Sequence, residues 1–278
     1  MSLGAAGPPG SELRQRVISG AVMAAVAIVA VWLGDWPFAM MLAIGAVLAS
    51  WEWGRIVRGF DFDSSFLLHA AAVALAVFAI TLGYPIAALF VLAAASAVLF
   101  ALRIGNRDRL SGIGVLVIGL AAVSLARLRA DSPYGLHAVL FLFAAVWMTD
   151  IGGYVFGRSI GGPKLWAAIS PGKTWAGAIG GLLLAAVAGA LTAGWLATRD
   201  VGSAILVAVM LGIAAEYGDL AESALKRRFG RKDASALIPG HGGLLDRIDG
   251  LMAAAIVAAA FAMLRNPFHP AAGLLLWP

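Results

Sequence analysis

The chain has 278 residues, of which 62% are hydrophobic and 13% are charged. Soluble globular proteins have about 45–50% apolar and about 25% charged residues, so a soluble core could not hide this much apolar surface and the surplus must face lipid. The absence of cysteine excludes disulfides, zinc–thiolate sites, iron–sulfur clusters and cysteine nucleophiles. The net charge of +5 is informative by position, because Lys and Arg set the orientation of membrane proteins.

The N-terminal segment 1–16 contains several Gly and Pro residues and ends with Arg14 and Arg16. We expect it to be a disordered cytoplasmic tail. The apolar run that follows, 17–34, is longer than the apolar core of a signal peptide and leads into no small-residue cleavage site. It is therefore interpreted as the first transmembrane helix.

Runs of about 20 mostly apolar residues predict spanning helices. Nine such runs occur along the chain, at 17–34, 37–54, 66–82, 85–102, 111–127, 135–156, 174–196, 202–225 and 248–264. The fold class is therefore expected to be all-α, a polytopic membrane protein with about nine transmembrane helices. We expect two regions: N-terminal transmembrane helices over 17–134 and a C-terminal region over 135–278 that carries the chemistry.

The distribution of Lys and Arg tests this arrangement. With the N-terminus in the cytoplasm, sixteen of the 20 Lys and Arg residues fall on the cytoplasmic side. This bias supports the orientation and an odd number of crossings. The two longest non-spanning stretches, 157–173 and 226–247, also fall on that side.

Acidic residues gather on the predicted helix 202–225. Asp219, Glu222, Ser223 and Lys226 have the i, i+3, i+4 and i+7 spacing of one helix face. Ion pairs with neighbouring bases would be the ordinary explanation of such a stripe. Polar residues inside spanning segments are nevertheless candidates for function, and carboxylates are the ligands that Mg²⁺ prefers.

A second group of charges follows the basic loop. Asp246 and Asp249 are three residues apart at the start of the last predicted helix, with Arg247 between them. The preceding loop is basic over 226–232 and contains a glycine-rich turn over 240–243. Basic side chains, free N–H groups in a glycine loop and flanking carboxylates together suit a substrate made of a metal ion and a polyphosphate.

An earlier loop has a similar composition. It contains Asp150 and the tripeptide Gly172-Lys173-Thr174. A P-loop is excluded, because position 167 is Ala where the first glycine is required and no strand is predicted before it.

These motifs resemble those of the phosphatidate cytidylyltransferases, the membrane CDP-diacylglycerol synthases. The resemblance is carried by Gly218 to Arg227, by Lys232-Asp233 and by Pro239 to Asp249. Residues 150–154 and 170–177 resemble a second block of that family, so the match covers roughly 150–250. It implies the reaction of CTP with phosphatidate to give CDP-diacylglycerol and pyrophosphate, in a bacterial cytoplasmic (inner) membrane.

The resemblance also implies roles for particular residues. Asp219, Asp246 and Lys226 are expected to be catalytic, and Asp219, Asp246 and Asp249 to bind Mg²⁺. The expected substrate-binding residues are Ser223, Arg227, Lys232, His241, Gly242, Gly243, Arg247, Lys173, Lys164, Ser170, Asp150 and Glu222. Asp150 either supports the metal ligands or braces the basic residues. A monovalent cation such as K⁺ beside the Mg²⁺ and a homodimer are also implied, and no nucleic-acid partner is expected.

The sequence departs from the family pattern in one loop. Gly172 stands where the family usually has Lys, Ala176 stands where it has Glu, and 166–168 lacks the usual proline. These changes affect the contacts of the 164–177 loop and leave the acidic residues from Asp219 to Asp249 intact.

Other classes of membrane protein fit less well. A transporter would place polar residues near the middle of the membrane in repeat-related helices, whereas here they gather on one face and in one half of the chain. A CTP-dependent polyprenol or phytol kinase is the enzyme alternative. CDP-alcohol phosphotransferases are excluded more firmly, because no acidic residue follows Asp249.

Overall fold

The computed structural model describes residues 9–101, 106–195, 200–238 and 242–277. Its helices and strands follow in the order α1 (Pro9–Leu33), α2 (Asp35–Val57), α3 (Ser64–Thr81), α4 (Pro85–Ala101), α5 (Asn106–Arg129), α6 (Gly135–Ser159), β1 (Lys164–Trp166), β2 (Ser170–Thr174), α7 (Trp175–Trp195), α8 (Val201–Arg228), α9 (Leu245–Arg265) and α10 (Pro270–Leu275). Each of the nine predicted runs overlaps one of the helices α1 to α9.

The chain is a helical, multi-pass membrane protein. Seven helices in the described part of the chain, α2, α3, α5, α6, α7, α8 and α9, are long and apolar enough to cross a membrane. The apolar stretch Ile18–Leu33 of α1 and helix α4 are shorter. The total of nine crossings and the orientation of the N-terminus remain predictions.

Three features differ from the sequence prediction. Helix α1 begins at Pro9, so residues 9–16 are helical and not part of a disordered tail; residues 1–8 lie outside the described ranges. The loop after α6 forms an antiparallel hairpin of β1 and β2, with Lys164 opposite Thr174 and Trp166 opposite Ser170. A short helix, α10, follows α9. Both extra elements are too short for the 20-residue criterion to detect.

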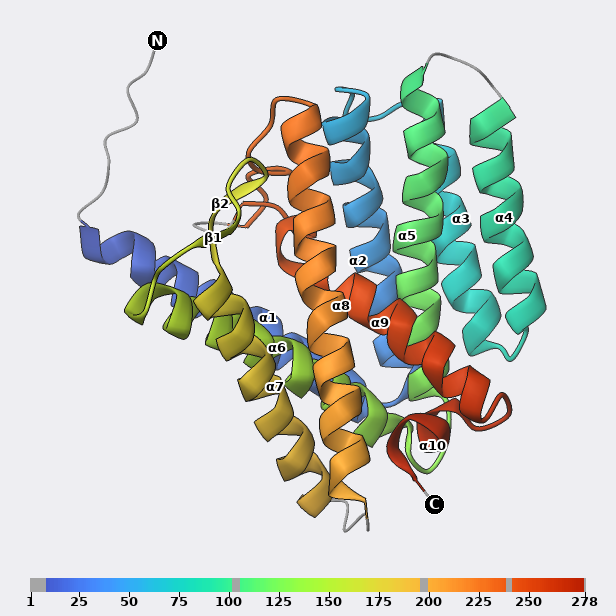
Figure 1. Ribbon diagram of the computed structural model, residues 1–278. Coiled ribbons are helices and arrows are strands. Elements are labelled where there is room, and N and C mark those ends of the chain that lie inside the picture. The colour runs from blue at the N-terminus through green and yellow to red at the C-terminus, as the bar shows by residue number, and fades with distance from the viewer. Residues whose placement is uncertain (1–8, 102–105, 196–199, 239–241, 278) are drawn as a thin grey trace.

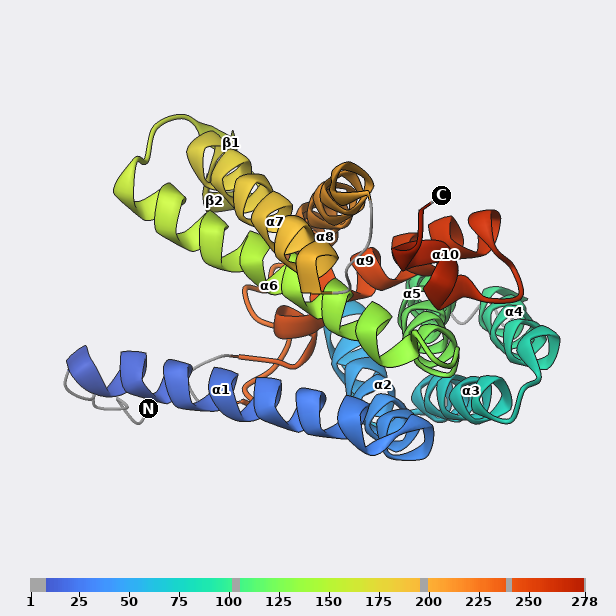
Figure 2. The same cartoon turned by 90° about the horizontal axis from the view of Figure 1, so that it is seen from below.

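The helices form two groups that α9 connects. Helices α2 to α5 pack against one another, as do α6, α7 and α8. Helix α9 packs on both α8 and α5, and Figure 1 shows it crossing from the centre of the molecule towards α10. Seen from below, α1 runs along one edge of the molecule, and α6 and α7 lie across from it (Figure 2).

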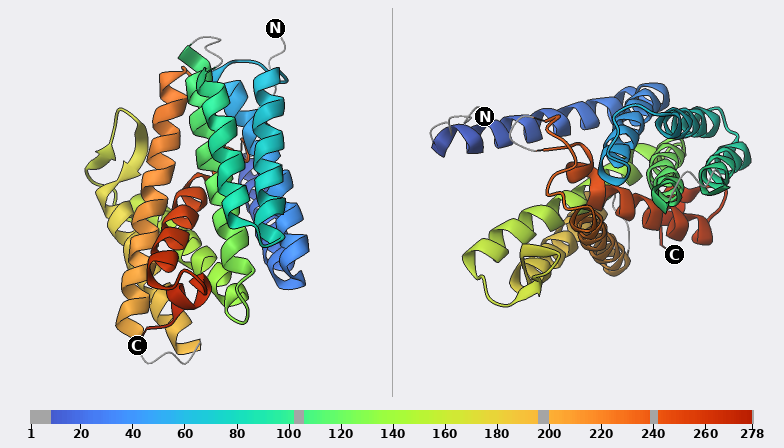
Figure 3. Two further views of the ribbon diagram at one scale, coloured as in Figure 1. Left: turned by 90° about the vertical axis from the view of Figure 1, so that its right-hand side faces the viewer. Right: turned by 90° about the horizontal axis from the view of Figure 1, so that it is seen from above.

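The upright group of α3, α4 and α5 and the hairpin lie on different sides of α8 (Figure 3). Helices α6 and α7 approach closely through glycines: a Cβ at Gly152 would lie 2.6 Å from the carbonyl oxygen of Gly180. Small residues at such crossings let helix backbones meet in membranes. The hairpin connects α6 to α7, so this contact places it on the side of α8 that bears the acidic residues.

Candidate active site

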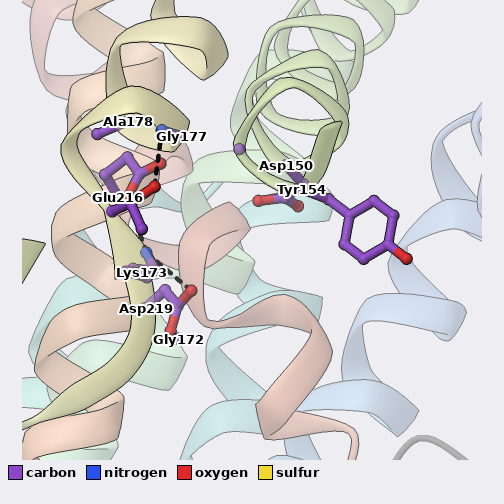
Figure 4. Close-up of a pocket in the computed structure, with 10 residues that line it drawn as sticks. Asp150, Tyr154, Gly172, Lys173, Gly177, Ala178, Glu216 and Asp219 are labelled. Atoms are coloured by element: carbon purple, nitrogen blue, oxygen red, sulfur yellow. Dashed lines mark hydrogen bonds and ion pairs between the residues drawn. The ribbon is translucent and has the colours of Figure 1, made fainter. Parts of the chain in front are cut away.

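The first charged group of the site centres on Lys173 of β2. Its Nζ lies 2.8 Å from Glu216 Oε2 and 2.9 Å from Asp219 Oδ2, both on α8. Asp219 also accepts a hydrogen bond from Ser223 Oγ at 3.3 Å. We call Lys173, Glu216 and Asp219 the Lys173 cluster. Figure 4 shows Lys173 between the two carboxylates, the Asp150 carboxylate across from them and the Tyr154 ring pointing away.

The hairpin holds Lys173 in this place. The next residue, Thr174, accepts a hydrogen bond from Gly177 N at 3.1 Å and so caps the start of α7. Burial of the ammonium opposes its charge, but the carboxylates of Asp219 and Glu216 outweigh this and raise the pKa of Lys173 above its ordinary value. Lys173 is therefore charged throughout the physiological pH range.

The second charged group centres on Lys226 of α8. Its Nζ forms ion pairs with Glu222, one turn earlier on α8, and with Asp246 Oδ1 of α9 at 2.6 Å. The side chain of Lys226 is 11% exposed, and those of Glu222 and Asp246 are each 5% exposed. We call these three residues the Lys226 cluster. The sequence placed Glu222 and Lys226 on one helix face, and the structure confirms that they meet.

Asp246 also orders the loop before α9. Its Oδ2 accepts hydrogen bonds from Gly243 N at 2.8 Å and from Ala234 N at 3.0 Å. Within the loop, Ile238 and Gly242 pair through their backbones, and Gly242 has a φ of 84°. Contact of Gly242 and Gly243 with substrate stays a prediction. Gly243 also has a structural role, because its N–H helps to hold Asp246 in place. His241 lies outside the described residues.

Glu52 of α2 is a site residue that the sequence analysis missed. It is fully buried, and its Oε1 accepts hydrogen bonds from Ser235 Oγ and from Leu244 N, the latter at 2.9 Å, while its Oε2 accepts one from Leu245 N at 2.6 Å. It thereby satisfies N–H groups at the start of α9 that have no partner within the helix. A lone acid within an apolar run was the available signal.

Two cavities meet at this site. One, of about 240 Å³, is lined by the Lys173 cluster together with Asp150, Tyr154, Gly172 and Thr174. The other, of about 730 Å³, is lined by Asp150, Asp219, Asp246, Arg247 and Asp249 and by apolar residues of α1, α6 and α9. Asp150 and Asp219 line both cavities.

Close packing of α8 on α9 brings carboxylates of both helices to one cavity. A Cβ at Gly218 would lie 2.5 Å from the carbonyl oxygen of Asp249, so only glycine allows this approach. Asp219, Asp246 and Asp249, the three predicted metal ligands, consequently line one cavity. Among the described residues, no three His, Asp or Glu side chains converge as a preformed metal site. One reason is that Asp246 faces Lys226 and backbone N–H groups.

The remaining predicted residues do not line these cavities. Arg227 is exposed and donates to the carbonyl oxygens of Ile169 at 3.3 Å and Arg231 at 3.2 Å, which ties α8 to the hairpin turn. Lys164 and Lys232 are exposed, and Ser170 is partly exposed. None of these three residues lines either of the two cavities.

The fold is a helical membrane bundle, and its two adjoining cavities carry carboxylates, lysine and arginine. These features define a membrane protein able to bind a charged ligand beside lipid. The chain belongs to the cytidylyltransferase family, which residues 14–264 match. It is similar to the phosphatidate cytidylyltransferase of Brucella suis biovar 1 (strain 1330), with 37% identity over an alignment of 278 positions that covers 94% of this chain and 98% of that protein.

Two further relatives give the same picture. The phosphatidate cytidylyltransferase of Brucella abortus (strain 2308) is 37% identical over an alignment of 266 positions, which covers 90% of this chain and 93% of that protein. That of Staphylococcus haemolyticus (strain JCSC1435) is 38% identical over 141 residues, which cover 50% of this chain and 53% of that protein.

Proposed function

We propose that the protein transfers the cytidylyl group of CTP to phosphatidate, giving CDP-diacylglycerol and pyrophosphate. The observation that carries this proposal is the cavity of about 730 Å³. Its polar residues come from the C-terminal halves of α6 and α8 and from the start of α9, and its apolar residues come mainly from α1 and α6. Such a cavity suits a substrate with a phosphate head and a hydrocarbon tail.

The smaller cavity suits the nucleotide phosphates. Lys173 presents a charged ammonium there, and the backbone of Gly172 and Thr174 lies beside it. The two cavities share Asp150 and Asp219, so the phosphates of the two substrates would meet at these residues. An oxygen of the lipid phosphate would attack the α-phosphorus of CTP, the α–β phosphoanhydride bond would break, and pyrophosphate would leave.

The donor set fits Mg²⁺. Carboxylate oxygens are the ligands that this ion prefers, and it usually binds through one or two carboxylates plus substrate phosphates. Asp219 and Asp249 would hold it. Asp246 would join them if its oxygens, which already accept hydrogen bonds from Lys226 and the loop N–H groups, also contacted the ion. When bound, Mg²⁺ supplies positive charge against the triphosphate and the leaving pyrophosphate.

The chain's own residues perform the remaining tasks. Lys173 and Arg247 would bind phosphate oxygens and offset the repulsion between two anionic substrates. Lys226 would hold Asp246 in place and keep the buried carboxylates paired. The excess of basic residues on one side supports a site at the cytoplasmic face of the inner membrane. A monovalent cation and a homodimer rest on the family resemblance alone.

A transfer assay with CTP labelled at either end tests the proposal. Purified protein in detergent micelles is given Mg²⁺ and dioleoyl phosphatidate with [α-³²P]CTP or with [γ-³²P]CTP. Cytidylyl transfer moves the α label into the lipid extract and leaves the γ label in pyrophosphate. A lipid kinase would do the reverse with polyprenol or phytol as acceptor, and that result would contradict the proposal.

A further inference from the structure

A third cavity of about 300 Å³ lies between α1, α2, α5, α6 and α9. Every lining residue is apolar; those from α2 and α5 include Met41, Gly45, Ala46 and Ala121. Protein interiors are otherwise closely packed, and an apolar cavity of ~150 Å³ is large enough to take up benzene. A cavity of this size without polar groups is therefore suited to a hydrocarbon ligand.

The apolar cavity adjoins the cavity of about 730 Å³ at the candidate active site. Both are lined by Met23 and Ala27 of α1, by Phe143 of α6 and by Ile248 and Leu251 of α9. A hydrocarbon chain attached to a phosphate at Asp219 and Arg247 could pass along these shared residues into the apolar cavity.

Helix α1 forms one side of this cavity through Val22, Met23, Val26 and Ala27. Val22 and Val26 are 56% and 54% exposed, so the cavity can be reached from outside beside α1. The polar end of the neighbouring cavity favours a lipid as the occupant over a second copy of the chain, because a helix from a partner would leave the carboxylates without a ligand.

We infer that the apolar cavity holds one acyl chain of the lipid substrate, with Gly45 of α2 leaving the space that the chain fills. This inference rests on the proposed function and adds a site for the substrate's tail. A Cβ at Gly45 would meet no atom within 4 Å, so a larger side chain there would enter free space in the cavity.

Gly45→Phe fills the cavity and is compared with Gly194→Phe. Gly194 also lies in a helix, α7, with no atom within 4 Å of a Cβ, but it is exposed and lines none of the three cavities. Transfer from CTP is measured with dioleoyl and with dihexanoyl phosphatidate. Gly45→Phe should lower kcat/KM about tenfold for the long lipid, as expected for the loss of about two buried methylenes. It should change kcat/KM less than twofold for the short lipid.

Gly194→Phe should leave both values unchanged. Equal losses of Gly45→Phe on both lipids, or none on either, would overturn the inference. Gly45→Leu is a smaller replacement to use if Gly45→Phe does not fold.

Photolabelling separates this inference from the proposed function. Phosphatidate with a diazirine at the end of one acyl chain is bound to the wild-type protein and irradiated without CTP. Labelling of the α2 and α5 segments around Gly45 and Ala121, lost in Gly45→Phe, supports the acyl site even if no cytidylyl transfer is found. Labelling confined to outward-facing residues such as Leu191 would contradict it, whatever the transfer assay gives.

Discussion

The two lysine clusters that include carboxylates of α8 have the same composition, one lysine and two carboxylates, but different surroundings. The Lys173 cluster lines the smaller cavity at the candidate active site, and its Asp219, whose side chain is 38% exposed, lines the larger one as well. The Lys226 cluster is buried, with no side chain more than 11% exposed, and its Asp246 also accepts hydrogen bonds from the loop before α9.

This difference in exposure assigns substrate binding to the Lys173 cluster and structural support to the Lys226 cluster. Charges in a partly exposed cluster contribute less to stability than buried ones and can be redirected to a ligand. Buried charges depend on their partners, because an unpaired buried charge is strongly destabilising. The Lys173 cluster should therefore govern substrate use, and the Lys226 cluster should govern the folding of the segment that carries Asp246 and Asp249.

The largest effect on stability is expected for Lys226→Met. This change leaves Glu222 and Asp246 buried without their cation and should lower the free energy of unfolding by about 3–5 kcal/mol. Thermal unfolding in detergent measures it. The double variant Lys226→Met/Glu222→Gln removes one of the stranded charges and should recover part of the loss. An unchanged unfolding temperature for Lys226→Met would show that the cluster is not a brace.

Glu52→Ala should have the next largest effect. It removes the acceptor for Leu244 N and Leu245 N, and buried donors left without a partner cost about 2–3 kcal/mol in total. Glu52→Gln keeps one acceptor oxygen and should cost about 1 kcal/mol. Thermal unfolding of both variants tests whether α2 braces the start of α9. Equal stability of Glu52→Ala and wild type would contradict this role.

Lys173→Met should affect substrate use more than folding. Removing a cation from a partly hydrated cluster should change stability by less than about 1 kcal/mol, whereas loss of a charge-assisted bond to phosphate should raise KM for CTP about tenfold. The exposed Arg228 supplies a control, since Arg228→Met removes one charge near the end of α8. A large loss of stability with an unchanged KM would reverse the roles given to the two clusters.

The smallest effect concerns pH. Because the pKa of Lys173 is raised above its ordinary value of 10.5, its contribution to stability is fully present below that value. It is lost only as the pH rises through the higher pKa of the folded state. The difference in unfolding temperature between wild type and Lys173→Met should therefore be constant from about pH 8 to pH 9. A decline of that difference within this range would contradict the ion pairs described.

The sequence predicted the long helices well, because apolar runs of about 20 residues have few alternatives. The i, i+3 and i+4 spacing also placed Asp219, Glu222 and Ser223 on one helix face, and the family motifs identified Lys173 as a candidate substrate-binding residue. What the sequence could not provide was the pairing between distant segments. Neither the contact of Lys173 with Glu216 nor that of Lys226 with Asp246 follows from spacing along the chain.

Glu52 shows the limit of reasoning by region. The N-terminal helices were interpreted as nearly free of chemistry, although a buried carboxylate there joins the loop before α9 across 192 residues. The β1–β2 hairpin escaped notice for a different reason: its strands have three and five residues, and their pairing depends on the position that α6 and α7 give the loop.

The most direct test of the account is Asp219→Asn, with lipid labelling from [α-³²P]CTP and thermal unfolding measured on the same preparation. Asp219 is the carboxylate shared by the Lys173 cluster and both cavities of the site. The account predicts a loss of transfer on the order of 100-fold, with the free energy of unfolding changed by less than about 1 kcal/mol. Wild-type transfer by a well-folded Asp219→Asn protein would contradict it.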